Sequence, residues 1–410
     1  MNKIRFIFFV GIISITLSAI LSEVYLKNYT IIGLWNIPYD APGFWDSYQF
    51  AWASESYAMG YDPLIENPVN PRGHQLNYPR IWHVLFRLGI NENHANILGI
   101  TIMLLFFLGI GIYWFSNRFS NITYISLSIF FLSPAVMLGI ERSNIELIIF
   151  FILSVALIID RYSRLISLSV VEFAGVLKLY PVFGFVYLLK EDKKRFLRLF
   201  IIAILIFLIY IAFTFNDVLQ VYKTTPKLAG SSFGINVWWM GLRKLMFFNI
   251  PISASLEVYF RIISYVIALI IVLLTLYRSL ISKSTESFRN GNYLDAFRLG
   301  AGIYIGCFFI HNHDYRLIFL AFTIPQLIEW TRDKMIHKIP TITLFMMISS
   351  VWSLFAMRFL GRRITFVMEE FSNWVLFACL LYLFFVSMPE WLKVYLRIPS
   401  SVFQNKTVKN

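Results

Sequence analysis

The polar stretch after the first apolar segment holds the side chains best suited to chemistry. Carboxylates, arginines and aromatic rings occur together between residues 27 and 87. They are Asp40, Asp46, Asp62, Glu66, Arg72, Arg80, Trp45, Trp52, Tyr57, Tyr61 and Tyr78. A carboxylate can take a proton from a hydroxyl group, and a cation can hold a phosphate. This composition suits a site for a sugar and a phosphate.

Three aspartates of this stretch are candidate general bases. Asp46 lies in FWDSYQF, which predicts a short interfacial helix, although Asp is also a common N-cap residue. Asp40 and Asp62 precede prolines in DAP and DPL, where Asp is favoured for turn geometry alone. We therefore rank Asp46 first, Asp40 second and Asp62 third.

Cations that could hold a phosphate occur in other polar clusters further along the chain. Arg142 lies in ERSN, Lys178 lies between two apolar arms, and Arg316 ends HNHDYR. Each could instead be a helix-end ion pair, and Lys178 could be a snorkelling lysine. His311, His313 and Asp314 could bind a metal, but that pattern is weak. We predict neither a metal nor a cofactor.

The composition is that of an integral membrane protein. Of the 410 residues, 58% are hydrophobic and 14% are charged, and the mean hydropathy is +0.67. A soluble domain carries about 25% charged residues. The formal charge of +13 falls mostly in short loops between apolar segments, which argues against a nucleic-acid surface. Cys307 and Cys379 lie inside apolar segments and indicate neither a disulfide nor a metal site.

Apolar stretches of about twenty residues predict an all-α, polytopic transmembrane bundle. We count about twelve membrane segments in one domain, residues 1–410. The N-terminus has a basic start followed by an apolar run at about residues 6–26, which indicates a retained signal anchor. The distribution of Lys and Arg places both termini in the cytoplasm. The loop at residues 27–94, a second loop rich in Trp (residues 216–251) and the clusters around Arg142, Lys178 and Arg316 then share the outer face.

Residues 165–190 predict a pair of short helices rather than one crossing. Basic residues flank both sides of this apolar segment, so both sides belong in the cytoplasm. The turn is expected at Lys178–Pro181, because proline suits the first turn of a helix. Lys178 would then lie at the floor of a recessed cavity.

Several of these motifs together resemble the GT-C superfamily of polytopic glycosyltransferases. Within it, the chain is most similar to the polyprenyl-phosphate-mannose-dependent family 87 and its uncharacterised bacterial relatives. The resembling elements are DSYQFAWASESYAMGYDPL with Asp46, Tyr78-Pro79, RSNIELIIF after Arg142, and GVLKLYPVFGFVYLLKEDKKR around Lys178. They span about the first two hundred residues. Arg80 replaces the second proline usual in that family, so the donor and acceptor pockets are expected to differ.

The resemblance implies an enzyme that uses a polyprenyl-phosphate sugar at the outer face of a bacterial inner membrane. Asp46, or else Asp40, would deprotonate the hydroxyl of a glycan or lipid-linked acceptor. The donor phosphate and substrates would be held by Lys178, Arg142, Arg316, Tyr78, Arg80 and His313. Two rival interpretations are a transporter or flippase of lipid-linked saccharide and an envelope polysaccharide polymerase. No nucleic-acid partner is expected.

Overall fold

The structure, a computed structural model, describes residues 3–38, 42–228, 230–246, 254–282, 285–289, 291–333 and 336–396. Elements labelled η are 3-10 helices, except η4, which is a π-helix. The first half contains α1 (Lys3–Leu26), α2 (Thr30–Gly33), α3 (Trp45–Ala58), η1 (Arg80–Leu88), η2 (Glu92–His94), α4 (Ala95–Phe115), α5 (Asn121–Phe131), α6 (Pro134–Arg142), α7 (Glu146–Ile159), α8 (Arg164–Lys178), η3 (Tyr180–Lys190) and α9 (Lys193–Thr224). The second half contains β1 (Ser232–Phe233), α10 (Val237–Gly241), η4 (Leu242–Met246), α11 (Ala254–Ile281), α12 (Thr285–Arg289), α13 (Leu294–Phe308), β2 (Asn312–His313), η5 (Asp314–Phe322), α14 (Ile324–Thr331), α15 (Lys338–Val351), α16 (Ser353–Val386) and α17 (Glu390–Leu396).

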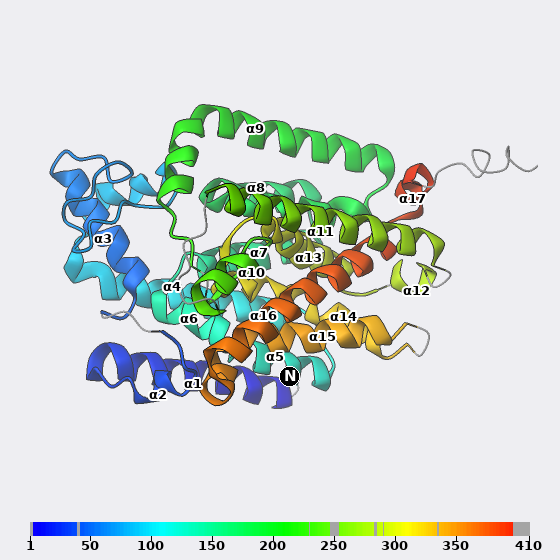
Figure 1. Ribbon diagram of the computed structural model, residues 1–410, viewed down its shortest axis with the longest axis horizontal. Coiled ribbons are helices and arrows are strands. Elements are labelled where there is room, and N and C mark those ends of the chain that lie inside the picture. The colour runs from blue at the N-terminus through cyan, green and yellow to red at the C-terminus, as the bar shows by residue number, and fades with distance from the viewer. Residues whose placement is uncertain are drawn as a thin grey trace, which may run out of the picture.

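The predicted all-α architecture is confirmed among these residues. Their only strands, β1 and β2, form a two-residue antiparallel ladder that joins Ser232 to His313 and Phe233 to Asn312. Helices α3 and α17 lie at opposite ends of the long axis, and α9 and α1 lie along opposite edges (Figure 1).

The predicted number of membrane segments is not confirmed. Five of the described helices are long and apolar enough to cross a membrane: α1, α4 extended back to Glu92, α9, α11 and α16. The pair α5 and α6, bent by 53°, would be a sixth. Other predicted segments are too short, since the 14 residues of α7 rise about 21 Å against a hydrocarbon core of about 30 Å.

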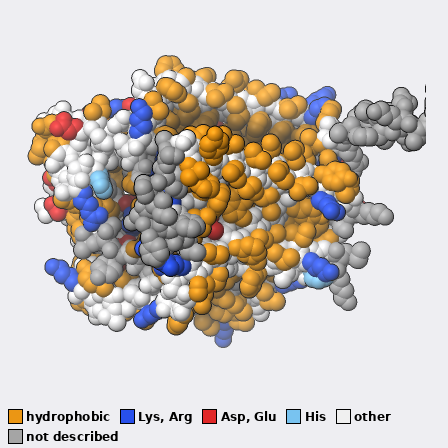
Figure 2. Space-filling model, in the orientation of Figure 1, with side chains coloured by type: hydrophobic (Ala, Val, Ile, Leu, Met, Phe, Trp, Pro, Cys, Tyr) orange, Lys and Arg blue, Asp and Glu red, His pale blue; other side chains and the backbone are white. Residues whose placement is uncertain are grey.

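The surface has an apolar flank and a more polar end. Hydrophobic side chains cover the face over α11 and α16, whereas polar and charged side chains gather at the end where α3 lies (Figure 2). The apolar windows of α9 and α11 are each only 11% buried inside the protein. Helices this apolar and this exposed suit contact with lipid.

The first long polar stretch folds into the protein instead of lying on it. Helix α3 is buried on nearly every side and packs against α4, α6, η1 and η2. Phe44 precedes α3 in a left-handed conformation (φ 62°) and packs onto Gly99 of α4. A Cβ atom at residue 99 would lie 2.4 Å from the Phe44 ring, so only glycine allows this approach.

Two sharp breaks between short helices bring polar side chains into the interior. Ser143, after α6, has a φ of 54°, and Leu179, between α8 and η3, has a φ of 43°. Such values are uncommon for residues other than glycine and mark abrupt turns. The break at Leu179 falls where the turn of the helix pair at residues 165–190 was predicted.

Candidate active site

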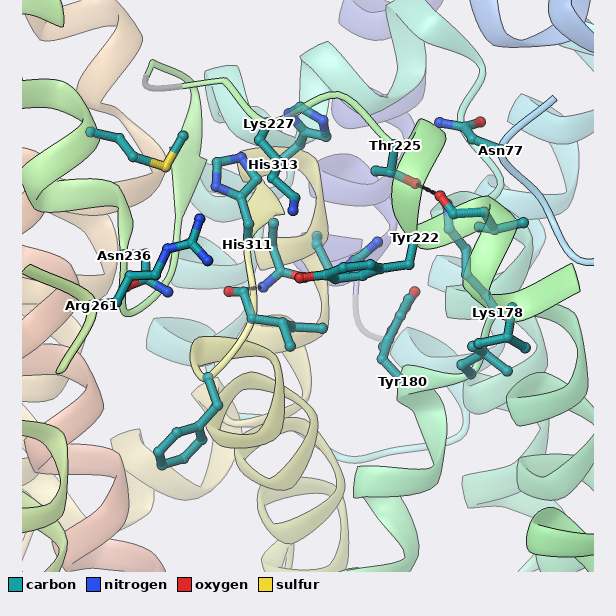
Figure 3. Close-up of a pocket in the computed structure, with 18 of the residues that line it drawn as sticks. Asn77, Lys178, Tyr180, Tyr222, Thr225, Lys227, Asn236, Arg261, His311 and His313 are labelled. Carbon is teal, nitrogen blue, oxygen red and sulfur yellow. Dashed lines mark hydrogen bonds between the residues drawn. The ribbon is translucent and has the colours of Figure 1, made fainter. Parts of the chain in front are cut away.

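A cavity of about 570 Å³ lies where the turns from both halves of the chain meet. Its wall includes residues of the α8–η3 turn, of β2 and η5, and of the apolar, exposed helices α9 and α11. Lys178 and Tyr180 lie on one side of the cavity, and Asn236 and Arg261 lie on the other (Figure 3). The cavity therefore joins a polar interior to the apolar flank of the molecule.

Glu146 organises the cationic side of this cavity. Its carboxylate is 0% exposed and lies in the first turn of α7. One oxygen is 3.0 Å from Lys178 Nζ and accepts a hydrogen bond from the Tyr180 hydroxyl at 3.0 Å. The other oxygen accepts from Arg316 Nε at 2.9 Å. Two cations thus share one buried carboxylate, so the group keeps one net positive charge.

Aromatic rings hold the same two cations against the cavity wall. Lys178 Nζ lies 4.6 Å from the centre of the Tyr78 ring, and Arg316 Cζ lies 4.2 Å from that of Tyr180. The side chains of Lys178 and Arg316 are only 13% and 14% exposed. Cation–π contacts and low exposure fix the positions of both charges before any ligand binds.

Asp46 lies next to this group and is connected to it through Asn144. Asn144 Nδ2 donates hydrogen bonds to Asp46 Oδ2 and, at 3.4 Å, to the Tyr78 hydroxyl. Lys178 Nζ donates to Asn144 Oδ1 at 3.4 Å. Burial raises the pKa of Asp46 above its ordinary value of 3.8, against the opposing effects of Arg142, Asn144 and Lys178. Asp46 itself does not line the cavity, whereas Tyr78 does.

Backbone contacts hold the start of α3 against the turn after α6. The Phe44 amide donates to the Glu141 carbonyl at 2.8 Å, and the Ser47 hydroxyl donates to that of Ser143 at 3.0 Å. Asn144 is in turn fixed because its Oδ1 accepts from the Glu146 amide at 3.0 Å. These contacts explain why Asp46 and Asn144 meet although 98 positions separate them in the chain.

Two histidines lie between the cations of the cavity. Burial and the nearby cations lower the pKa of His311 to about 4 and that of His313 to about 3. His313 Nδ1 lies 3.5 Å from the Ser232 hydroxyl across the short β ladder. Both imidazoles are therefore neutral near pH 7 and add no charge to the cavity.

The predicted site residues other than Arg80 fall into three groups. Four of them line the cavity, namely Lys178, Tyr78, Arg316 and His313. Asp46 shares Asn144 with Tyr78, and Arg142 lies near enough to Asp46 and His313 to influence their charge, but neither Asp46 nor Arg142 lines the cavity. Asp40 lies outside the described residues.

Arg80 does not line the cavity, although the preceding residue, Pro79, does. It forms ion pairs at 2.8 Å with Asp62 and with Asp217, and its side chain is 43% exposed. These pairs connect the first polar stretch to the end of α9, so Arg80 has a local role that the sequence did not indicate.

Several residues of the site were missed by the sequence prediction. Glu146, which holds two of the cavity's cations, was not singled out. Nor were the cavity residues Tyr180 and Tyr315, or the group Lys227, Arg243, Lys244 and Arg261. Glu146 had a usable signal, since it is an ionisable residue inside the apolar run IELIIF. The others lie in segments whose neighbours only the folded chain specifies.

The described residues contain no group of three or more His, Cys, Asp or Glu side chains that could hold a metal ion. What the site offers is fixed cations, a buried carboxylate with a raised pKa, neutral imidazoles and aromatic walls. Such groups can bind a phosphate and accept a proton. The chain matches no family model, no curated protein and no solved structure.

Proposed function

We propose that the protein is a membrane glycosyltransferase that moves a sugar from a polyprenyl-phosphate donor to the hydroxyl of a cell-envelope acceptor. The observation that supports it most is the cavity wall itself. Lys178 and Arg316, held by Glu146, lie in the same cavity as residues of the apolar, exposed helices α9 and α11. The site would face outward from a bacterial inner membrane.

The donor phosphate would bind at Lys178 and Arg316. A phosphodiester carries one negative charge, and these two cations with Glu146 carry one net positive charge. Arginine and lysine form strong charge-assisted hydrogen bonds to phosphate oxygens. Preorganised cations also stabilise the charge that builds on the leaving phosphate, which is where electrostatic catalysis is most effective.

The lipid chain of the donor would reach the cavity from the bilayer between α9 and α11. Val218, Val221 and Tyr222 of α9 and Tyr265 of α11 line the cavity. The rest of each helix is apolar and exposed, as a lipid-facing helix should be. A prenyl chain would therefore stay in an apolar environment while its phosphate meets the two cations.

Transfer would be a displacement at the anomeric carbon of the donor sugar. The acceptor oxygen forms a bond to that carbon, the bond from the carbon to the phosphate oxygen breaks, and polyprenyl phosphate leaves. The acceptor proton passes to the carboxylate of Asp46. Asp46 does not line the cavity, so the acceptor hydroxyl must approach it past the wall that includes Tyr78. A positioned base contributes about 10²–10⁴-fold.

Purified protein in vesicles tests the proposal directly. The vesicles would contain a radiolabelled undecaprenyl-phosphate hexose, and envelope glycan extract would supply the acceptor. We expect labelled glycan and free undecaprenyl phosphate in wild-type samples and neither with Asp46→Asn. Comparing the masses of envelope glycans with and without the protein then identifies the product. Movement of intact donor across the bilayer without sugar transfer would instead support the flippase interpretation.

A further inference from the structure

A second group of cations lines the same cavity away from Glu146. Lys227 follows α9, Arg243 and Lys244 belong to η4, and Arg261 belongs to α11. Arg261 lies across the cavity from Lys178, and Lys227 lies close to His311 and His313 (Figure 3). The cavity therefore has two cationic groups.

The second group is poorly compensated by carboxylates. Arg261 pairs with Glu257, one helical turn earlier, at 2.5 Å. Lys227 Nζ lies 4.4 Å from the centre of the Tyr222 ring. Within the described part of the chain, no carboxylate forms an ion pair with Lys227, Arg243 or Lys244. Four cations and one carboxylate leave three net positive charges on this side.

The proposed donor does not account for these charges. The first group has one net positive charge, which one phosphodiester balances. The histidines between the two groups are neutral because burial and nearby cations lower their pKa values, to about 4 for His311 and about 3 for His313. Three further charges are thus left facing a cavity whose wall also includes Trp239 and Tyr265. Several cations around one cavity raise its positive potential, so this arrangement suits a second anion.

The exposure of the group indicates where that anion comes from. Lys227, Lys244 and Arg261 are exposed, whereas Lys178 and Arg316 are nearly enclosed. Solvent reaches the second group more easily than the first. A water-soluble ligand, or the soluble head of a larger one, can therefore approach it without crossing the donor site.

We propose that the second substrate is anionic: an acceptor whose phosphate or carboxylate group is held by Lys227, Arg243 and Lys244 while its hydroxyl faces the donor. Arg243 can bind such a group through two parallel N–H donors, and the lysines add point charges. This inference rests on the proposed function, because it assigns the acceptor of the same reaction.

Binding of a matched pair of sugars tests the inference without turnover. Glucose 6-phosphate and glucose would be titrated into the full-length protein in nanodiscs of uncharged lipid, with calorimetric detection. We expect glucose 6-phosphate to bind at least about tenfold more tightly than glucose. The variant Arg243→Gln/Lys244→Gln should abolish that preference, while Lys193→Gln/Lys194→Gln, an equal charge loss outside the cavity, should retain it.

Two results would overturn the inference. One is equal binding of both sugars by the wild-type protein, or a preference that survives Arg243→Gln/Lys244→Gln. The other is native mass spectrometry in which an anionic lipid stays bound to the wild-type protein and leaves the double variant, with no preference for glucose 6-phosphate. The group would then be a site for a lipid headgroup.

Transfer assays distinguish failure of this inference from failure of the proposed function. Equal transfer to neutral and anionic acceptors would contradict the proposal of an anionic acceptor but would still support the glycosyltransferase function. The opposite result is also possible: glucose 6-phosphate binds in a way that depends on Arg243 and Lys244, but the protein transfers no sugar. This result would contradict the glycosyltransferase function and still support the anion site.

Discussion

Glu146 has more polar contacts with cavity residues than Asp46 or Asp62 of the first polar stretch. Its carboxylate is fully buried and contacts Lys178, Tyr180 and Arg316. Asp46 is also buried, but it reaches the cavity only through Asn144 and Tyr78. We therefore assign Glu146 to positioning the phosphate site and Asp46 to accepting the proton.

Asp46→Asn isolates the basic function of this residue, because Asn keeps the shape of Asp but cannot accept a proton at neutral pH. We expect sugar transfer to fall at least about a hundredfold with donor binding retained. Asp62→Asn is the matched control, since Asp62 pairs with Arg80 and neither lines the cavity. Normal transfer by Asp46→Asn, measured with labelled donor, would remove Asp46 from the mechanism.

The pH dependence of transfer follows from the burial of Asp46. A base works only when deprotonated, and burial raises the pKa of Asp46 above 3.8. The value of kcat/KM should therefore fall as pH falls through a point above 3.8, and this acid limb should be absent from the residual rate of Asp46→Asn. His313→Asn should leave the limb in place, because the pKa of His313 is already lowered to about 3. If the acid limb disappeared in His313→Asn and not in Asp46→Asn, the imidazole of His313 would be the base instead.

Lys178→Gln and Arg316→Gln should each weaken binding of the donor phosphate. One charge-assisted hydrogen bond contributes about 1.5–3 kcal/mol, so the Kd for dodecyl phosphate should rise at least about tenfold. Each variant leaves Glu146 one cationic partner, which should allow it to fold. Arg80→Gln removes the same charge outside the cavity and should leave the Kd unchanged. Equal effects of all three variants would indicate long-range electrostatics instead of a site.

At the scale of helices, the site depends on close packing between α4 and α7. Gly109 of α4 faces the backbone of Phe151 in α7, and a Cβ atom at residue 109 would lie 2.7 Å from the Phe151 Cα. Since Glu146 begins α7, the position of this helix fixes the carboxylate that holds both cations. Packing far from the cavity therefore affects the site.

Gly109→Ala should lower stability by forcing α4 and α7 apart. Overpacking in a well-packed interior typically costs about 1–3 kcal/mol, so the thermal midpoint in detergent should fall by several degrees. Gly11→Ala in α1 is the matched control, because nothing lies within 4 Å of a Cβ atom there. It should be neutral or slightly stabilising, since alanine favours helix. Equal midpoints for the two variants would show that α4 and α7 separate without cost.

At the scale of the whole molecule, the two ends of the apolar flank should face opposite sides of a membrane. Leu179 lines the cavity near α3, and Lys193 begins the long helix α9. Helix α9 is kinked at Thr214, and the 21 residues before the kink, 193–213, rise about 32 Å, which is enough for a hydrocarbon core of about 30 Å. One end of α9 can therefore lie on each side.

Cysteine labelling in intact cells tests this arrangement. Cys307 and Cys379 would first be replaced by serine, and a single cysteine would be introduced at Leu179 or at Lys193. A membrane-impermeant maleimide added outside should label position 179, and position 193 only after the cells are opened. Labelling of position 193 from outside would reverse the topology and place the cavity in the cytoplasm.

Hydropathy alone was enough to predict a helical membrane protein, because apolar composition and charge distribution are local properties of the chain. The same local reasoning selected Asp46, Lys178 and Arg316, since ionisable residues stand out in apolar surroundings. It does not fix the number of membrane segments, because an apolar helix buried by neighbouring helices has the composition of one buried by lipid.

Only the tertiary structure decided which polar groups meet. Arg316 and Glu146 are 170 positions apart, and Arg80 and Asp217 are 137 positions apart. No local pattern encodes such pairs, because they depend on where sharp turns such as Leu179 and close approaches such as that at Gly99 direct whole helices. The second cationic group became apparent for the same reason: η4 and α11 place its members around one cavity.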